Sequence, residues 1–156
     1  MLALTHEITC NKEDYEQGNP FCYFSRKTSL VLFRSQNSGK GEVFCALEQY
    51  EEALAAFDQI LQVDPSNMWA YSWKGTALYG LKRYEESLAA YEEAIRLGST
   101  YKEYFYSKGV CLVELGRYEE AIAAYDQAIQ IDPSYTNAYR GKAKAISQLG
   151  QLKQMR

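Results

Sequence analysis

Apolar side chains recur every three or four residues along much of the chain, in pairs of adjoining stretches. One stretch carries Tyr71, Gly75 and Leu78 on a single helix face, and the next carries Leu88, Tyr91 and Ile95. A spacing of three or four residues returns a side chain to the same side of an α-helix. The pattern therefore predicts two successive helices, each with one buried face.

The same pattern returns at an offset of 34 residues without a gap. The aligned positions are Lys40, Lys74, Lys108 and Lys142, then Gly41, Gly75, Gly109 and Ala143, then Leu47, Leu81, Leu115 and Leu149. The second half of each unit aligns Tyr50-Glu51-Glu52-Ala53 with Tyr84-Glu85-Glu86-Ser87 and Tyr118-Glu119-Glu120-Ala121. A single register with this many matches indicates an internal repeat, and a repeat of this length is typical of stacked helical hairpins.

Turn-forming residues separate the two helices of each unit and end the second helix. The links between the helices are residues 48–49, 82–83 and 116–117. Paired glutamates follow each link, where the positive end of a helix dipole favours them. Asp64-Pro65 and Asp132-Pro133 end the second helix, because proline disfavours helix in the residue before it, and Gly98-Ser99-Thr100 is expected to end the one between.

Residue size along the repeat predicts how the helices pack. The small residues Gly41, Gly75, Gly109 and Ala143 share one register position, which would let the two helices of a hairpin approach closely. The bulky aromatics Tyr71, Tyr91, Phe105 and Tyr125 would fill the spaces between successive hairpins. One hairpin alone leaves much of its apolar surface exposed, so a stable array needs about three units.

These residues resemble the tetratricopeptide repeat (TPR) family, whose pattern is an aromatic, Gly or Ala, Tyr, Ala, an aromatic, Ala and Pro over a helical hairpin. The resemblance implies an all-α solenoid, a right-handed superhelix with a concave inner groove. It predicts an array over 37–156, with repeats at about 34–67, 68–101 and 102–135 and a C-terminal capping helix at 136–154. Asn37 stands where an aromatic is usual, so the first helix is expected to start near Ser38.

The first 36 residues do not follow the repeat register. Gly18-Asn19-Pro20 is a turn signal, and the apolar runs that follow, residues 21–24 and 29–33, could form two short strands. An isolated hairpin is only marginally stable, so residues 1–36 are interpreted as a poorly ordered segment or a small hairpin. A stray translated extension upstream of the array is a third alternative.

Composition and charge narrow the classes of partner. The chain is 47% apolar and 24% charged, as in proteins that bury a core, with a formal charge of −3 and a pI near 5.3. That balance gives no electrostatic reason to expect nucleic acid or an anionic membrane as a partner. The N-terminus has no signal-peptide pattern and no apolar stretch is long enough to span a bilayer, so we expect a cytoplasmic protein.

Catalytic, metal and cofactor chemistry is not indicated. His6 is the only histidine, and the four cysteines form no C-x-x-C pair. His6 and Cys10 are four residues apart, but a surface coincidence is favoured over a catalytic dyad. The stretch Ser38-Gly39-Lys40-Gly41 lacks the first glycine and the final Ser or Thr of a phosphate loop. We therefore expect a protein that is not an enzyme and has no cofactor or metal.

In the TPR family the first helix of each hairpin lines the concave surface, so its outward residues are the candidate binding positions. Mapped onto this sequence, they are Trp69, Ser72, Thr76, Tyr79, Glu103, Tyr106, Val110, Asn137, Arg140 and Lys144. The groove is expected to be aromatic in the middle and basic at its end. Tyrosines offer flat area with a hydrogen-bonding tip, and Arg140 and Lys144 could meet a carboxylate of a partner.

Some family members grip the C-terminal carboxylates of chaperone tails with Lys, Asn and Arg on three successive first helices. The matching places here are Ser38, Glu42, Trp73, Glu103 and Ser107, or one unit later Ser72, Thr76, Ser107, Asn137 and Gly141. Neither set supplies the cations. We therefore expect no chaperone-tail carboxylate clamp.

The leading hypothesis is a non-enzymatic scaffold that binds a peptide or partner protein in its concave groove. The alternative is a structural element that self-associates through the array ends, using Ile146, Leu149 and Leu152. The chain could also be a fragment of a larger TPR protein. Because fold does not imply function, the sequence names neither the partner nor the pathway.

Overall fold

The computed structural model describes residues 39–98 and 100–155. The chain divides into two units, residues 1–36 and 37–156, and the described residues all lie in the second. The predictions of a poorly ordered segment or small hairpin before residue 37, and of a surface position for His6 and Cys10, fall outside the described residues.

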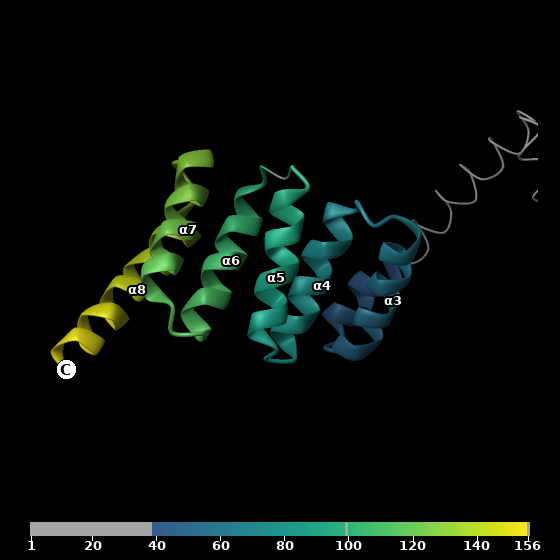
Figure 1. Ribbon diagram of the computed structural model, residues 1–156, viewed down its shortest axis with the longest axis horizontal. Coiled ribbons are helices and arrows are strands. Elements are labelled where there is room, and N and C mark those ends of the chain that lie inside the picture. The colour runs from purple at the N-terminus through teal and green to yellow at the C-terminus, as the bar shows by residue number, and fades with distance from the viewer. Residues whose placement is uncertain (1–38, 99, 156) are drawn as a thin grey trace, which may run out of the picture. The chain divides into compact units, whose positions relative to one another are not determined.

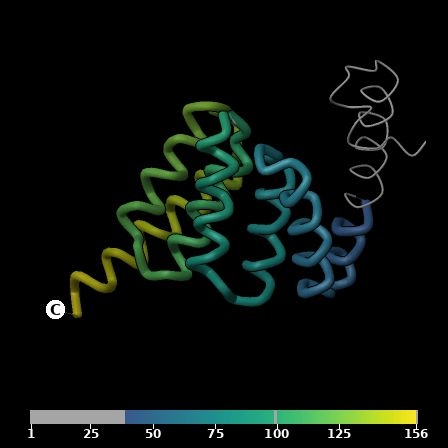
Figure 2. Tube along the Cα trace, turned by 45° about the vertical axis from the view of Figure 1, so that its right-hand side comes forward, coloured from purple at the N-terminus to yellow at the C-terminus, as the bar shows by residue number. Residues whose placement is uncertain are grey.

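Every regular element in the described part of the chain is an α-helix. Residues 39–46 are helical, and they are followed by α3 (Tyr50–Val63), α4 (Met68–Gly80), α5 (Tyr84–Arg96), α6 (Lys102–Glu114), α7 (Tyr118–Ile131) and α8 (Thr136–Gln154). From α3 onward each helix packs against the next, and α6 also contacts α8 (Figure 1). The backbone path runs back and forth through these helices in chain order (Figure 2).

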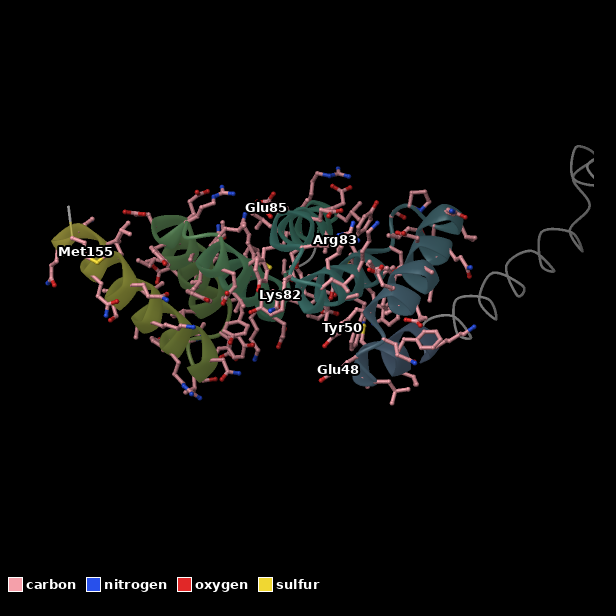
Figure 3. All side chains as sticks on the ribbon, turned by 90° about the horizontal axis from the view of Figure 1, so that it is seen from below. Glu48, Tyr50, Lys82, Arg83, Glu85 and Met155 are labelled. Carbon is pink, nitrogen blue, oxygen red and sulfur yellow. The ribbon has the colours of Figure 1, made fainter. Side chains whose placement is uncertain are left out.

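The turn inside each hairpin places one residue in the left-handed region, with φ values of 59° at Glu48, 60° at Lys82 and 73° at Gly116. In the second hairpin the Lys82 amide donates to the Tyr79 carbonyl, and the Arg83 amide donates to the Leu78 carbonyl. The other two turns make the same pair of bonds, which satisfies carbonyls that would otherwise end the helix unpaired. Figure 3 labels Glu48 and Lys82, the two of these residues that carry a side chain.

The connections between hairpins use short aspartate-centred turns at two places. The Asp132 side chain accepts hydrogen bonds from the backbone amide and the hydroxyl of Ser134, and Asp64 makes the same pair with Ser66. Between α5 and α6 the chain instead leaves the helix through Gly98, whose φ is 97°. The predicted stops after each second helix are therefore found at Asp64, Gly98 and Asp132.

Glycine allows the close contact inside each hairpin. A Cβ added at Gly75 would lie 2.9 Å from the Tyr91 ring, and one added at Gly109 would lie 2.6 Å from the Tyr125 ring. Gly41 stands in the same relation to Phe57. The predicted close approach at these three glycines is confirmed, and the facing aromatic rings are buried in the core.

An ion pair spans each described junction between repeats. Lys74 on α4 contacts Asp58 on α3 at 2.6 Å, Lys108 on α6 contacts Glu92 on α5 at 2.9 Å, and Lys142 on α8 contacts Asp126 on α7 at 2.5 Å. The lysines that recur every 34 residues in the sequence thus link the first helix of one unit to the second helix of the unit before it.

The last helix, α8, exposes to solvent the side that the first helices of the preceding repeats, α4 and α6, bury. Leu78 and Leu112 are 2% and 1% exposed, whereas Ile146, at the same register position of α8, is 50% exposed. The second helix of a hairpin covers the two leucines, and within the described residues no helix follows α8. The helix α8 ends at Gln154.

Candidate functional site

The candidate site lies along the first helices α4, α6 and α8, which follow one another at the repeat spacing. Because these three helices have the same register, residues at equivalent positions recur along one side of the array. Most of the binding positions expected from the sequence gather here in two adjoining pockets.

The first pocket has a volume of about 260 Å³ and lies between α4, α5 and α6. Its lining residues are Thr76, Tyr79, Tyr91, Tyr106, Ser107 and Val110. Four of them were expected from the sequence, and the pocket brings these four together. Tyr91 and Ser107 were missed as groove residues. Tyr91 had been assigned only to packing, although the ring and hydroxyl of a tyrosine can serve a core and a pocket at once.

Tyr91 forms a fixed wall of this first pocket. Its ring is buried against Gly75, and its hydroxyl lies 2.9 Å from the Thr76 hydroxyl. Burial raises the pKa of Tyr91 to about 12, against the opposing effect of hydrogen bonds from Thr76 and Ser107. The pKa of Tyr79 is also raised, mainly by burial and to a smaller extent by the nearby Glu114 carboxylate. Both phenols therefore keep their protons at neutral pH and offer hydrogen-bonding groups beside apolar rings.

The second pocket has a volume of about 390 Å³ and lies between α6 and α8. Its lining residues are Tyr106, Asn137, Arg140, Gly141 and Lys144. Gly141 was not among the groove residues expected from the sequence. A Cβ at this position would lie 2.7 Å from the Tyr125 ring, so glycine is what permits α8 to approach that ring.

Tyr106 belongs to both pockets and stands between them. Its ring centroid lies 5.7 Å from that of Tyr125 and 5.6 Å from that of Tyr135, the second pair in an edge-on arrangement. Ring contacts of this kind each add a modest stabilisation beyond area burial. Two neighbouring rings thus hold in place the side chain that the two pockets share.

The charges of the second pocket are unbalanced. Among the described residues neither Arg140 nor Lys144 has an ion-pair partner, although they lie four residues apart on one face of α8. Most other cations of the described array are paired: Lys74, Lys102, Lys108 and Lys142 as well as Arg83, Arg96 and Arg117. Two neighbouring cations therefore remain available to a ligand in a protein whose net charge is negative.

Sequence comparisons support the repeat assignment. A sequence model described as "Tetratricopeptide repeat" matches residues 39–102, and one described as "TPR repeat" matches residues 109–150. Together they cover most of the array. The chain belongs to the tetratricopeptide repeat family. The family and the all-α hairpin solenoid expected from the sequence are confirmed. No curated protein shows significant similarity to this TPR chain.

Solved TPR structures share the fold. The second TPR domain of human RPAP3, in complex with the HSP70 peptide SGPTIEEVD, is 21% identical, and the match covers 74% of this chain and 97% of that one with a TM-score of 0.71. The TPR2B domain of yeast Sti1, in a complex with pHsp70, is 19% identical over 75% and 98% of the two chains, with a TM-score of 0.70.

A third similar structure is YrrB, described as a TPR protein with an unusual peptide-binding site. It is 25% identical over 73% of this chain and 59% of its own, with a TM-score of 0.64. At these identities the solved structures establish the likeness of fold, and what each binds is a property of that protein.

Three expected groove residues of the TPR array have other contacts in the structure. Trp69 packs edge-on against Phe57 at 5.7 Å and lies 6.1 Å from Trp73, beside the core of the first described hairpins. The Ser72 carbonyl accepts a hydrogen bond from Thr76. Glu103 is exposed and lies 4.0 Å from Lys102. Their part in ligand binding stays a prediction.

The positions that would form a chaperone-tail clamp can be compared with these pockets. In the second set of clamp positions, which begins at Ser72, Thr76 and Ser107 line the first pocket, and Asn137 and Gly141 line the second. The cations of the second pocket, Arg140 and Lys144, both belong to α8 and are not among these clamp positions. The absence of a clamp stays a prediction from the sequence.

No cluster of three or more His, Cys, Asp and Glu side chains within residues 39–98 and 100–155 could hold a metal ion. Within the same ranges no helix has the length and apolar character needed to cross a membrane.

Proposed function

We propose that this TPR chain is a protein-interaction scaffold that holds a segment of a partner protein in the groove along α4, α6 and α8. The observation that carries the proposal is the pair of pockets that share Tyr106 in their linings. A peptide lying along the first helices would meet aromatic and hydroxyl groups in the first pocket and cations in the second.

The chemistry of the lining suits this task. Five residues that line the first pocket carry hydroxyls: Thr76, Tyr79, Tyr91, Tyr106 and Ser107. Rings supply contact area with little side-chain entropy to lose, and hydroxyls can bond to the backbone of an extended peptide. Helices held by inter-repeat packing present these groups in fixed positions, which lowers the ordering cost of binding.

Similar proteins are consistent with a binding role. Human RPAP3 and yeast Sti1 domains of this fold were solved with chaperone-derived ligands, and YrrB is described as having a peptide-binding site. These proteins support protein binding in general. The groove as the site, and the residues in it, rest on the geometry of this chain.

The proposal is tested by affinity capture from lysate with the wild-type chain and a Tyr79→Ala/Tyr106→Ala/Lys144→Glu variant. We expect a partner that wild type retains and this groove variant loses, because the substitutions remove one ring of the first pocket, the ring that both pockets share and one cation. Circular dichroism first establishes that both proteins are equally helical.

A matched control carries the same charge change away from the groove: Gln59→Ala/Gln127→Ala/Lys153→Glu, all at exposed positions. Retention by wild type and control, with loss from the groove variant, supports the proposal. Equal retention by all three proteins contradicts it and moves the binding surface outside the groove.

The open face of α8 favours a second candidate function, self-assembly through the end of the array. Ile146 and Leu152 are exposed on this helix, at 50% and 38%. Analytical ultracentrifugation over a hundredfold concentration range tests this alternative. A mass that rises with concentration in wild type and stays monomeric in Ile146→Glu supports assembly, whereas a constant monomeric mass excludes it.

A further inference from the structure

The geometry points to a specific class of ligand for this groove: an extended, internal segment of a partner protein that places an apolar side chain in the first pocket and an Asp or Glu side chain in the second. This inference rests on the proposed groove function and adds the chemistry and the spacing of the two anchor residues.

The second pocket is built to receive an anion. Arg140 and Lys144 project from adjacent turns of α8 into one depression, and neither is neutralised by another described residue. Lys142 lies two residues from each of these cations, on another face of α8, and is paired with Asp126. A carboxylate entering the pocket would gain charge-assisted hydrogen bonds from both cations.

Asn137 adds a polar amide to the same pocket, and Tyr106 gives it one aromatic wall. The amide and the planar guanidinium can bond to a carboxylate and to the adjacent peptide backbone at once. This donor set comes from a single helix. It therefore fits one side-chain carboxylate, in contrast to the chain-terminal carboxylates that a clamp spread over three helices would hold.

The first pocket fits an apolar side chain. Val110 and the rings of Tyr79 and Tyr106 provide apolar surface, and its 260 Å³ volume is below that of most small-molecule sites. The hydroxyls of Thr76 and Tyr91 bond to each other across its wall, so their hydrogen-bonding capacity is already partly used. A leucine-sized to phenylalanine-sized side chain is the matching occupant.

The shared wall sets the spacing of the two anchors. Tyr106 is the one residue that lines both pockets. In an extended peptide, side chains at positions i and i+2 point to the same side. Because each residue advances the chain by roughly 3.3 Å, these two side chains lie about 6.6 Å apart. That separation is about the thickness of one side chain, so we expect an apolar residue and an acidic residue two positions apart.

The test is selection from a display library of random nonapeptides that are linked through their C-termini, so that no free terminal carboxylate is present. The full chain is immobilised as bait. We expect enrichment of Asp or Glu two positions from an aliphatic or aromatic residue. Replacing the acid of a selected peptide by its amide should weaken binding about tenfold to hundredfold, as for loss of charge-assisted hydrogen bonds.

Charge reversal gives the decisive comparison. The Arg140→Glu/Lys144→Glu variant should select Lys or Arg at the position where wild type selects acid, while keeping the preference for the apolar residue. The control Lys82→Glu/Lys153→Glu has the same net charge change at residues outside both pockets, and it should keep the wild-type preference. Arg140→Gln/Lys144→Gln, with a milder change, should lose the acid preference without gaining another.

The outcomes separate this inference from the function on which it rests. Peptides that require Tyr79 and Tyr106 but show no acid preference overturn the inference and leave groove binding standing. Enrichment that is the same for wild type and a Tyr79→Ala/Tyr106→Ala variant overturns groove binding and the inference with it. A swapped charge preference in both the pocket variant and the control also overturns the inference, because it shows that net charge alone guides selection.

Discussion

At the scale of single residues, the hairpin turns show a conformational constraint that differs between repeats. The left-handed position is glycine in the third described hairpin but glutamate and lysine in the first two, at Gly116, Glu48 and Lys82. A side chain in this region costs roughly 1 kcal/mol relative to glycine. The three turns share their hydrogen bonds, so the residue at this position can be changed without changing the motif.

The first prediction follows from this difference. Lys82→Gly should raise the free energy of unfolding by about 1 kcal/mol, because the strain exceeds the added entropy of the unfolded glycine. Gly116→Lys should lower it by a similar amount. Urea denaturation monitored by circular dichroism measures both, and a destabilised Lys82→Gly variant would show that the lysine side chain contributes contacts that outweigh its backbone strain.

A second prediction concerns Asp132. Hydrogen bonding to Lys102, with further bonds from Ser134, lowers the pKa of this carboxyl to about 2. A carboxyl with a folded pKa below its unfolded value stabilises the fold above the unfolded pKa, near 4, and loses that contribution as pH falls toward the folded pKa. Stability should therefore fall between about pH 4 and pH 2 in part through this group.

The variant Lys102→Met isolates that contribution, since methionine already stands at the equivalent register position, Met68. We expect the Asp132 pKa to rise toward its ordinary value, measured by the pH dependence of its carboxyl carbon shift in NMR. An unchanged Asp132 pKa would mean that the Ser134 bonds alone hold it low.

The sequence predicted individual residues best where one position has one role. Gly41, Gly75 and Gly109 were recognised as close-approach positions because the register isolates them. Tyr91 was interpreted only as packing, since a periodic aromatic gives no sign that its hydroxyl reaches a pocket. Gly141 was missed because its neighbour, Tyr125, belongs to the preceding repeat.

At the scale of helices, the second helix of each unit determines how much of the first is buried. Leu112 on α6 is covered by α7, whereas Ile146 on α8 has no such cover. The helices themselves were predictable from periodicity and stop signals, which are local. The ion pairs across the junctions between repeats, such as Lys108 with Glu92, could not be predicted in this way, because they depend on the offset between neighbouring hairpins.

A third prediction uses this contrast. Leu112→Ala should lower the free energy of unfolding by about 2–5 kcal/mol, the range for a large aliphatic side chain removed from a packed core. Ile146→Ala, at the equivalent position of α8, should cost less than about 1 kcal/mol because half of the side chain already contacts water. Equal losses from both variants in denaturant titrations would show that something covers α8 in solution.

At the scale of the whole array, function arises from putting equivalent helices next to one another. No single hairpin contains the site: α4, α5 and α6 enclose the first pocket, α6 and α8 enclose the second, and Tyr106 joins them. The repeat and its family were readable from the sequence. The sequence does not show whether Arg140 and Lys144 form ion pairs, because that depends on which carboxylates the fold brings near them.

The most direct test of the groove is site-specific photo-crosslinking in lysate. The photoreactive residue p-benzoylphenylalanine is placed at Asn137, on the rim of the second pocket, and in a control protein at Gln127, an exposed position of α7. Groove binding predicts a discrete crosslinked partner from position 137 and none from 127. The same partner crosslinked from 127, with none from 137, would contradict groove binding and place the contact on the second helices.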